Sequence, residues 1–231
     1  MNGSCSSVAI KMGVNPFATR YVAPGRVPWI DPGNAGIDDL VNRFRALGSR
    51  AAVVGKHGTG KSTLLEHLVP KLGRVVYRCD FQGNMRASTP PVTDQPNVIE
   101  SRNCGAIAWV GLRGRRSIRV LQAGLKRLSA GDLLVVDGFE QLSTFQRMRV
   151  RWLTRRSRLG LLVTCHRDLG LPCLHQTRVS PQLALAVVSE VCSLVGETTK
   201  LEQSLVLELL GSERGNLREV MMRLYDEFES N

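Results

Sequence analysis

The chain has 231 residues, of which 43% are hydrophobic and 22% charged, a balance typical of a folded globular protein and outside the range of disordered chains. No apolar run approaches the roughly 20 residues of a membrane-spanning helix, and residues 1–12 lack the pattern of a signal peptide. We therefore expect a cytoplasmic protein that makes no membrane contact.

The net charge of +11 is distributed unevenly along the chain. Residues 1–180 contain 27 Lys and Arg against 11 Asp and Glu, whereas residues 181–231 contain 4 against 9. This difference predicts two modules. The basic excess of the first favours a polyanionic partner such as nucleic acid, although 25 of the basic residues are Arg, a bias that a GC-rich genome also produces.

The first elements in chain order are an irregular arm, a helix, a strand and a second helix. Residues 1–36 are rich in Gly, Pro, Ser and Asn, so we expect an arm that is anchored by Phe17, Tyr21 and Trp29. Residues 37–47 carry apolar side chains at helical spacing and end at Gly48, which predicts a helix. Residues 50–55 form a short apolar run typical of a buried strand, and residues 61–71 have the period of an amphipathic helix.

The turn between that strand and helix reads Gly-Lys-His-Gly-Thr-Gly-Lys-Ser and fits the pattern G-x-x-x-x-G-K-[ST] without a mismatch. Glycines in such a turn let the backbone wrap a phosphate with its N–H groups pointing inward, at the positive end of the following helix. Lys61 would reach the β- and γ-phosphates of a nucleotide, and the Ser62 hydroxyl would ligate Mg²⁺. The His57 side chain is assigned no chemistry. The residues expected to contact the nucleotide are Gly55, Lys56, His57, Gly58, Thr59, Gly60, Lys61, Ser62 and Thr63.

Further apolar runs, at residues 73–79, 106–110, 132–137 and 159–164, alternate with helical segments. Continuous apolar strands separated by helices imply a mainly parallel sheet that is covered on both faces, so the expected fold is α/β with three layers, α/β/α. Residues 80–104 show no clear periodicity and are expected to form a long excursion. A helix is expected after the basic segment 113–119.

Polar residues follow two of these strands, at the edge of the sheet where the phosphate-binding turn would lie. Asp137 ends the strand of residues 132–137, and we expect it to hold Mg²⁺ together with Ser62. Glu140 is the first acid after Asp137, because residue 138 is Gly; it would activate water for hydrolysis, or it is an ordinary helix-start residue. Thr164 and His166 end the next strand, where they would contact the γ-phosphate or the attacking water, or serve as polar strand caps.

Residues 140–158 have the period of a helix with two distinct faces. The apolar face consists of Leu142, Phe145, Met148 and Trp152. Another face carries a basic stripe formed by Arg147, Arg151, Arg155 and Arg158. The stripe and the basic segment 113–119, with Arg113, Arg115, Arg116 and Arg119, are candidate nucleic-acid surfaces, and a solvated face is the alternative. Arg149 and Arg156 fall on the apolar side, where either snorkelling or a role as an arginine finger for a neighbouring subunit would explain them.

Residues 180–231 predict three short helices that form a small acidic module. Ser180 and Pro181 fit the N-cap and first position of the first helix. Capping boxes are expected at the start of the other two, in the pairs Thr199 with Glu202 and Asn216 with Glu219.

The order of these motifs resembles the AAA+ superfamily of P-loop ATPases, with a linker, Walker A at residues 55–62, Walker B at residues 133–137, a polar strand end and a helical lid. Residues 15–20 and 160–167 are also similar to small bacterial P-loop ATPases. The resemblance implies an arm at residues 1–36, a nucleotide-binding α/β domain at 37–179 and a lid domain at 180–231. It further implies that Arg218 is a sensor 2 arginine that reaches the γ-phosphate, a surface arginine in the first helical turn being the alternative.

The expected function is Mg²⁺-dependent ATP binding and hydrolysis, coupled to lid movement and to a protein or nucleic-acid partner. One alternative is a nucleotide-gated DNA-binding adaptor with little turnover, and another is a small-molecule kinase on the same scaffold, which the acidic tail fits poorly. A GTPase is disfavoured because the chain contains no N-K-x-D motif. The sequence leaves a homo-oligomer open.

Overall fold

The computed structural model describes residues 14–30, 36–79, 85–88, 105–112, 117–195 and 202–230. Two sequence predictions lie outside this range. One is the basic segment 113–119, of which only the backbone of residues 117–119 is described, and the other is the capping role of Thr199. The predicted position of its partner Glu202 is wrong, because Glu202 is itself the N-cap residue of the helix that begins at Gln203. In the part that is described, no helix is long and apolar enough to cross a membrane.

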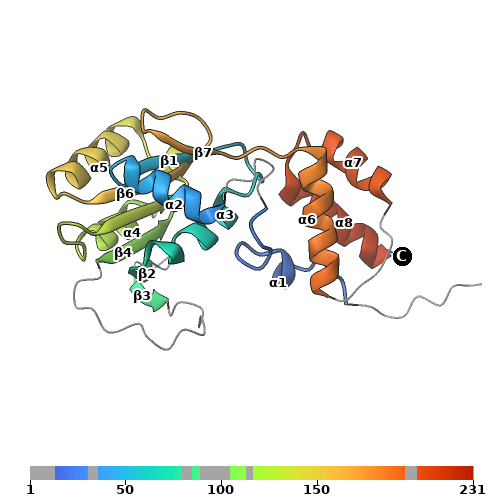
Figure 1. The fold of residues 1–231 in the computed structure, drawn as a ribbon. Coiled ribbons are helices and arrows are strands. Elements are labelled where there is room, and N and C mark those ends of the chain that lie inside the picture. Colours follow the sequence, from blue (N-terminus) through green and yellow to red (C-terminus); the bar gives the residue numbers. More distant parts are fainter. Residues whose placement is uncertain are drawn as a thin grey trace, which may run out of the picture.

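A seven-stranded sheet forms the centre of the larger unit, with the strand order β3-β2-β4-β5-β6-β1-β7 (Figure 1). Neighbouring strands run parallel except β2 and β3, which are antiparallel. The strands are β1 (Arg50–Val54), β2 (Val75–Cys79), β3 (Met85–Ser88), β4 (Ala106–Gly111), β5 (Leu133–Asp137), β6 (Gly160–Cys165) and β7 (Cys173–Gln176). The predicted α/β class with a mainly parallel sheet is therefore confirmed.

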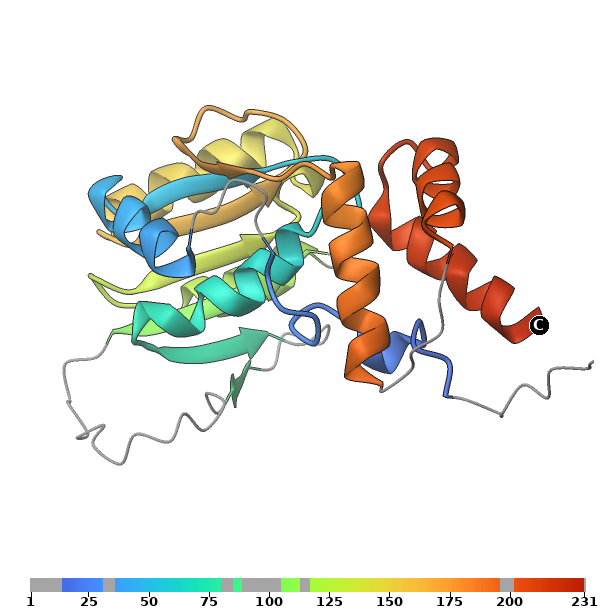
Figure 2. The same ribbon diagram turned by 45° about the vertical axis from the view of Figure 1, so that its right-hand side comes forward.

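Helices cover both faces of the sheet (Figures 1 and 2). On one face lie α2 (Ile37–Ala46), α3 (Lys61–Leu68) and the 3-10 turn η1 (Pro70–Leu72); on the other lie α4 (Ser117–Leu125), the 3-10 turn η3 (Phe139–Gln141) and α5 (Thr144–Arg156). Successive side chains of a strand point to opposite faces, so Ala51 and Val53 join the first core and Ala52 joins the second. The chain therefore builds the expected three layers.

A separate helical unit stands beside the carboxyl edge of the sheet (Figure 1). It contains the short α1 (Thr19–Val22), α6 (Pro181–Leu194), α7 (Gln203–Ser212) and α8 (Leu217–Ser230). The predicted start of α6 is confirmed, because the Ser180 hydroxyl accepts a hydrogen bond from the Leu183 N–H at 3.1 Å and Pro181 follows it.

The N-terminal arm packs into the core of this helical unit. Phe17 and Val27 are buried there, and the Asn15 side chain donates hydrogen bonds to the backbone oxygen of Tyr225 (3.1 Å) and to Glu229 Oε1 (2.9 Å). Farther along the arm, the Val27 carbonyl lies 3.0 Å from His67 Nε2 on α3. The described part of the arm thus contacts both units.

Two strands and one helix differ from the sequence prediction. β3 lies within the predicted excursion 80–104, and β7 was not predicted at all. The predicted helix 140–158 is interrupted after η3, and α5 begins only at Thr144, where Ser143 and Gln146 exchange capping hydrogen bonds.

The apolar face predicted for this helix points to solvent except at Leu142, which precedes α5 and is buried. Phe145, Met148 and Trp152 have relative exposures of 72%, 64% and 59%, because α5 instead turns Val150 and Thr154 toward the sheet. Arg149 and Arg156, which the sequence places on the same side as these apolar side chains, are therefore on an exposed surface.

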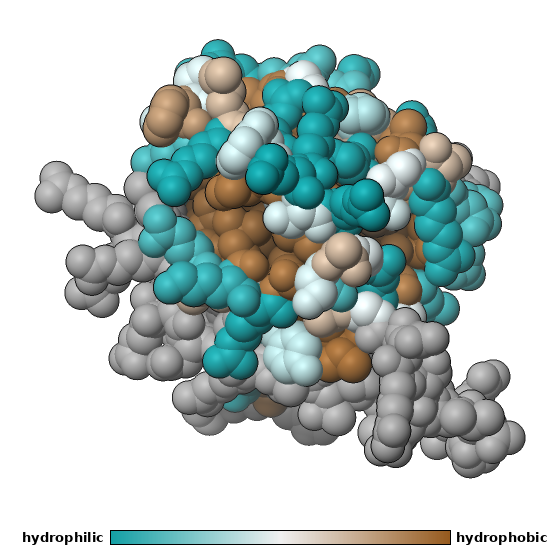
Figure 3. All heavy atoms as spheres, turned by 90° about the vertical axis from the view of Figure 1, so that its left-hand side faces the viewer, coloured by the Kyte–Doolittle hydropathy of each residue, from teal (hydrophilic) through white to brown (hydrophobic). Residues whose placement is uncertain are grey.

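The opposite, amino-terminal edge of the sheet contains a cavity of about 450 Å³. Figure 3 faces this edge and shows a hydrophobic hollow ringed by hydrophilic side chains. The residues lining the cavity come from the ends of α2 and α5, from η1, from the first residues of β1, β5 and β6, and from the turns beside them.

Candidate functional site

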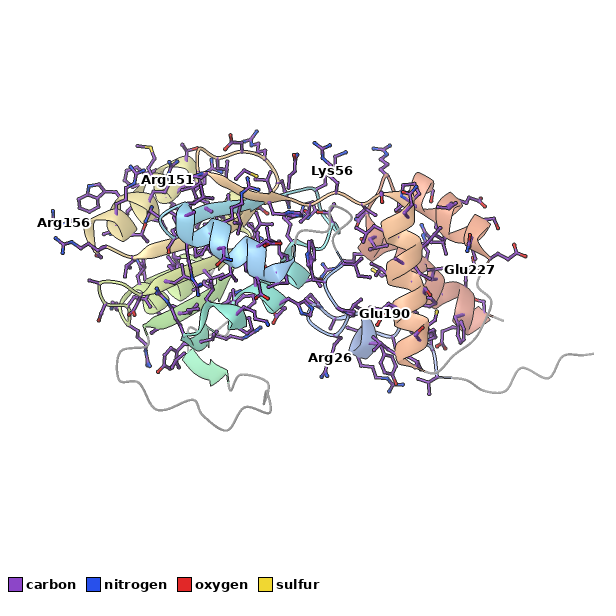
Figure 4. All side chains as sticks on the ribbon, viewed as in Figure 1. Arg26, Lys56, Arg151, Arg156, Glu190 and Glu227 are labelled. Carbon is purple, nitrogen blue, oxygen red and sulfur yellow. The ribbon has the colours of Figure 1, made fainter. Side chains whose placement is uncertain are left out.

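The glycine-rich turn between β1 and α3 lies at the carboxyl edge of the sheet, between the two units. Figure 4 places the Lys56 side chain at this junction. Gly58 and Gly60 have φ angles of 68° and 87°, a left-handed conformation that favours glycine. A Cβ atom on Gly55 would lie 2.0 Å from Thr177 Oγ1, so no larger residue fits there without moving the chain. The three glycines thus have geometric reasons for their positions.

Other side chains fix the shape of this turn. The Thr59 hydroxyl donates to the Lys56 carbonyl at 2.9 Å and lies 2.7 Å from Thr177 Oγ1. The Lys56 and His57 side chains are exposed, whereas Ser62 and Thr63 are half-buried in the first turn of α3.

Lys61 folds back over the turn. Its Nζ donates to the carbonyl oxygens of Gly55 (2.8 Å) and Lys56 (2.6 Å). Burial lowers the pKa of Lys61, and the nearby carboxylates of Glu140 and Asp137 act in the opposite direction. The ammonium group therefore occupies the centre of the turn, within the field of two acids.

The Asp137 carboxylate joins three segments of the sheet edge. Its Oδ2 accepts a hydrogen bond from the Ser62 hydroxyl at 2.8 Å, and its Oδ1 accepts one from the Thr164 hydroxyl at 2.5 Å. The backbone N–H of Gly138 donates to Thr164 Oγ1 at 2.8 Å. Because β6 lies between β1 and β5, Thr164 at the end of β6 fills the space between the ends of its neighbours.

Ser62 and Asp137 together provide part of a coordination sphere of the kind that Mg²⁺ uses. Among the described residues, no group of three or more His, Cys, Asp and Glu side chains could hold a metal ion by itself. Mg²⁺ is commonly bound by one or two protein oxygens together with phosphate oxygens and water, and the Ser62 hydroxyl with the Asp137 carboxylate fits that donor set.

Glu140 reaches the same site because Gly138, with a φ angle of 86°, starts the tight turn η3. Its Oε1 lies 3.1 Å from His166 Nε2, and the ring of His57 contacts the ring of His166 edge-on with centroids 3.7 Å apart. Burial lowers the pKa of His166; Glu140 opposes this shift, while Lys61 and His57 add to it. Burial and the neighbouring cations thus disfavour the charged form of His166, and only Glu140 favours it.

The helical unit touches the turn through the start of α8. A Cβ atom on Gly58 would lie 1.6 Å from Asn216 Oδ1 and 3.2 Å from the backbone nitrogen of Arg218. The predicted capping role of Asn216 is wrong, since its Oδ1 has no hydrogen-bond partner among the described residues and faces the turn instead. Arg218 lies beside the turn with an exposed side chain.

Trp29 contacts the glycine-rich turn, which its position in the sequence did not predict. Its ring lies 3.3 Å from the position of a Cβ on Gly60 and packs edge-on against His175, with centroids 5.6 Å apart. Aromatic residues in an irregular arm predict an anchor, and nothing in their spacing indicated which part of the chain Trp29 would contact.

Buried polar atoms without partners gather around the turn. Four buried side-chain nitrogen or oxygen atoms in the described part of the chain have no hydrogen-bond partner. Three of them, Trp29 Nε1, Glu140 Oε2 and Asn216 Oδ1, belong to residues that border the turn or its acids. Buried polar groups are normally satisfied, so their clustering indicates a site for a polar ligand or ordered water.

The structure brings Lys61, Ser62, Asp137, Glu140 and Thr164 together but leaves the basic stripe elsewhere. Two stripe residues make contacts of their own. Arg151 donates to the carbonyl oxygens of Leu169 (2.9 Å) and Gly170 (2.6 Å), and Arg147 donates to Thr144 Oγ1 at 3.0 Å.

Comparison with known proteins adds no assignment: no protein-family model matches the chain, and no curated protein matches its sequence.

The contact between Gly58 and Asn216 can be tested with a matched glycine. Gly73 has nearly the same φ angle, 69° against 68°, but open space around its Cβ position. We expect Gly58→Ala to lower the free energy of unfolding by about 1–3 kcal/mol more than Gly73→Ala, through overpacking against Asn216. Urea denaturation measures both values, and the excess should vanish in an Asn216→Ala background. Equal losses at the two glycines would refute the contact.

The electrostatic link between Glu140 and His166 predicts a change in pKa. Because Glu140 raises the pKa of His166 against the effect of burial, Glu140→Gln should lower that pKa further below its ordinary value. An NMR titration of the imidazole nitrogens measures it directly, with His67, in the last turn of α3, as internal reference. An unchanged or higher pKa for His166 in the variant would contradict the described geometry.

Proposed function

We propose that the chain binds ATP with Mg²⁺ at the turn of residues 55–62 and hydrolyses its terminal phosphoanhydride. The observation that carries this proposal is the hydrogen bond of 2.8 Å between Ser62 and Asp137, residues 75 positions apart in the chain. A turn of the Walker A pattern and the acid of a Walker B strand meet there as phosphate and metal binding requires.

Different groups of the chain would bind the phosphates and the metal ion. The backbone N–H groups of the turn and the start of α3 would face the phosphates, where the helix dipole favours negative charge. Lys61 Nζ would exchange its two backbone carbonyl partners for the β- and γ-phosphate oxygens. Ser62 and Asp137 would hold Mg²⁺, which neutralises charge that develops on the phosphates.

Glu140 is the proposed base. Its Oε1 is engaged by His166, while its Oε2 is buried without a partner among the described residues and can accept a hydrogen bond from a water molecule. Thr164 would help to place the γ-phosphate or that water from the adjacent strand end. Glu140 and Thr164 are both on the sheet edge near Lys61, so a short movement brings either to the phosphate.

The start of α8 supports a coupled movement of the helical unit. Asn216 and the Arg218 backbone occupy the space beside Gly58, and the exposed Arg218 side chain is free to turn toward a γ-phosphate. ATP would therefore bias the position of α8, which is the sensor 2 role implied by the resemblance to AAA+ proteins. On this basis we assign the fold to the P-loop NTPases with an AAA+-like lid.

A second candidate function is nucleotide-gated binding with little turnover. The contact between Glu140 and His166 favours it, because a carboxylate that is occupied by an imidazole is a poorer base for water. In that case ATP would be bound and would move α8, while hydrolysis would stay slow.

Steady-state ATPase activity and ATP affinity together distinguish these functions. We expect Glu140→Gln to bind ATP with unchanged affinity and to lower turnover about 100-fold or more, as loss of a general base does. Glu208→Gln, an exposed glutamate on α7, is the matched control and should turn over like the wild type. Equal turnover in wild type and Glu140→Gln would rule out Glu140 as the base, and negligible turnover in both would favour the gated binding protein.

A further inference from the structure

The outer surface of α5 carries an apolar stripe, with two aromatic rings, that nothing in the described structure covers. Phe145, Met148 and Trp152 recur at intervals of three and four residues, so they share one side of the helix, opposite Val150 and Thr154 on the sheet side. Phe145 and Trp152 are seven residues apart, which is about 10 Å along the helix axis. Large apolar side chains this exposed usually mark an interaction site.

Arginines share that surface with the aromatic rings. The thirteen residues of α5 include five arginines and no acid. Arg149, Arg155 and Arg156 are exposed, and the Arg156 guanidinium lies 5.7 Å from the centre of the Trp152 ring. In Figure 4, Arg156 extends from the outer end of α5 away from the rest of the protein. The surface therefore combines planar apolar groups with arginines that form no ion pair in the described part of the chain.

The cavity at the amino-terminal edge of the sheet, which Figure 3 faces, lies at the end of α5. Arg155 and Thr154 of α5 line it, so the two features meet at the end of the helix. Its apolar lining is Phe44, Leu72, Leu133 and Leu159, and its basic lining is Arg45, Arg50, Arg74, Arg155 and Arg158. No Asp or Glu is among its lining residues, all of which are described.

Arg50, which lines the cavity, has no acidic partner among the described residues. Its guanidinium donates to the carbonyl oxygen of Leu159 (2.9 Å) and to Thr154 Oγ1 (3.1 Å), but its buried Nε has no partner in the described part of the chain. Burial, Arg155 and Arg151 all lower the pKa of Arg50, and no acid opposes them. A partly buried cation without a counter-charge favours an anionic ligand.

We propose that the outer face of α5 and the adjoining cavity bind single-stranded nucleic acid. Bases would stack on Phe145 and Trp152, and Arg149, Arg155 and Arg156 would contact the phosphates. The cavity, whose volume of about 450 Å³ lies within the range of small-ligand pockets, would take one unstacked nucleotide with its phosphate near Arg50.

The arrangement fits a single strand better than a duplex or a membrane. A duplex keeps the faces of its bases stacked on one another, so the exposed rings would have nothing to stack on. A helix that lies in a membrane surface keeps its charges opposite its apolar side chains. In α5 the opposite side faces the sheet, so insertion of the rings would carry Arg156 with them.

This site is separate from the proposed nucleotide site and does not rest on it. Arg50 begins β1 and Gly55 follows its last residue, and Leu133 and Asp137 lie at the two ends of β5. The two sites therefore occupy opposite edges of one sheet, and both can be filled in the same molecule.

Fluorescence anisotropy of labelled oligonucleotides with the full chain tests the proposal. We expect oligothymidylate to bind more tightly than a duplex of the same length, and Phe145→Ala with Trp152→Ala to weaken single-strand binding about 10-fold or more. Met222→Ala with Tyr225→Ala is the matched control, since these α8 residues are also exposed, at 57% and 37%. The control should bind like the wild type.

Two further measurements identify the contacts. Arg155→Gln with Arg156→Gln should reduce the dependence of binding on salt concentration by about one unit of slope for each arginine. Trp152→Phe, which keeps a ring, should retain most of the affinity and shows that the effect is stacking and not loss of folding. The three findings that would overturn the proposal are no binding at low salt, equal binding of duplex with no loss in the alanine variants, and binding only to anionic lipid vesicles.

Discussion

A single carboxylate connects the parts of the proposed site. Asp137 accepts hydrogen bonds from Ser62 and Thr164, and so ties the start of α3 and the end of β6 to the end of β5. In a parallel sheet, the carboxyl ends of strands that are far apart in sequence meet at one edge. Parallel sheets are normally covered on both faces. Here helices cover both faces with apolar side chains, and the strands between them are therefore buried. The positions of Ser62, Glu140 and Thr164 depend on this edge.

The features that could be predicted from sequence are those with a local signal. The strands β5 and β6, which carry Asp137 and Thr164 at their carboxyl ends, are mostly continuous apolar runs, and the glycine-rich turn has a fixed spacing that encodes its geometry. β7 has no such signal: its four residues, Cys173 to Gln176, mix exposed and buried positions, and it becomes a strand by pairing with β1. Tertiary context, which no local pattern contains, decides such elements.

The same limit explains α5 and Asn216. Phe145, Met148 and Trp152 at helical spacing identify a stripe, but spacing is the same whether a sheet or solvent faces it. The sequence of a capping box at Asn216 is present, yet the side chain turns toward Gly58, a residue 158 positions earlier whose contact no local rule anticipates. Long-range packing places Trp29 and Asn216 at the candidate site. Their contacts there were accordingly found only in the structure.

The buried polar side-chain atoms that have no partner among the described residues lie near the two edges of the sheet. Trp29 Nε1, Glu140 Oε2 and Asn216 Oδ1 lie around the turn at the carboxyl edge, and Arg50 Nε lies at the amino edge. Nothing about the fold requires polar groups to remain unsatisfied in these places, and ligands at both edges would account for them. The proposed sites for ATP and for single-stranded nucleic acid therefore lie at opposite ends of the same β-strands.

The most direct test of the central claim is the effect of Mg²⁺ on ATP affinity in wild type and Asp137→Asn. If Ser62 and Asp137 hold the metal, Mg²⁺ will tighten ATP binding by the wild type and will have little effect on the variant. Without Mg²⁺ the variant should bind ATP at least as well as the wild type, because a negative charge beside the phosphates is gone. A full Mg²⁺ effect in Asp137→Asn, or no ATP binding by the wild type, would contradict the account.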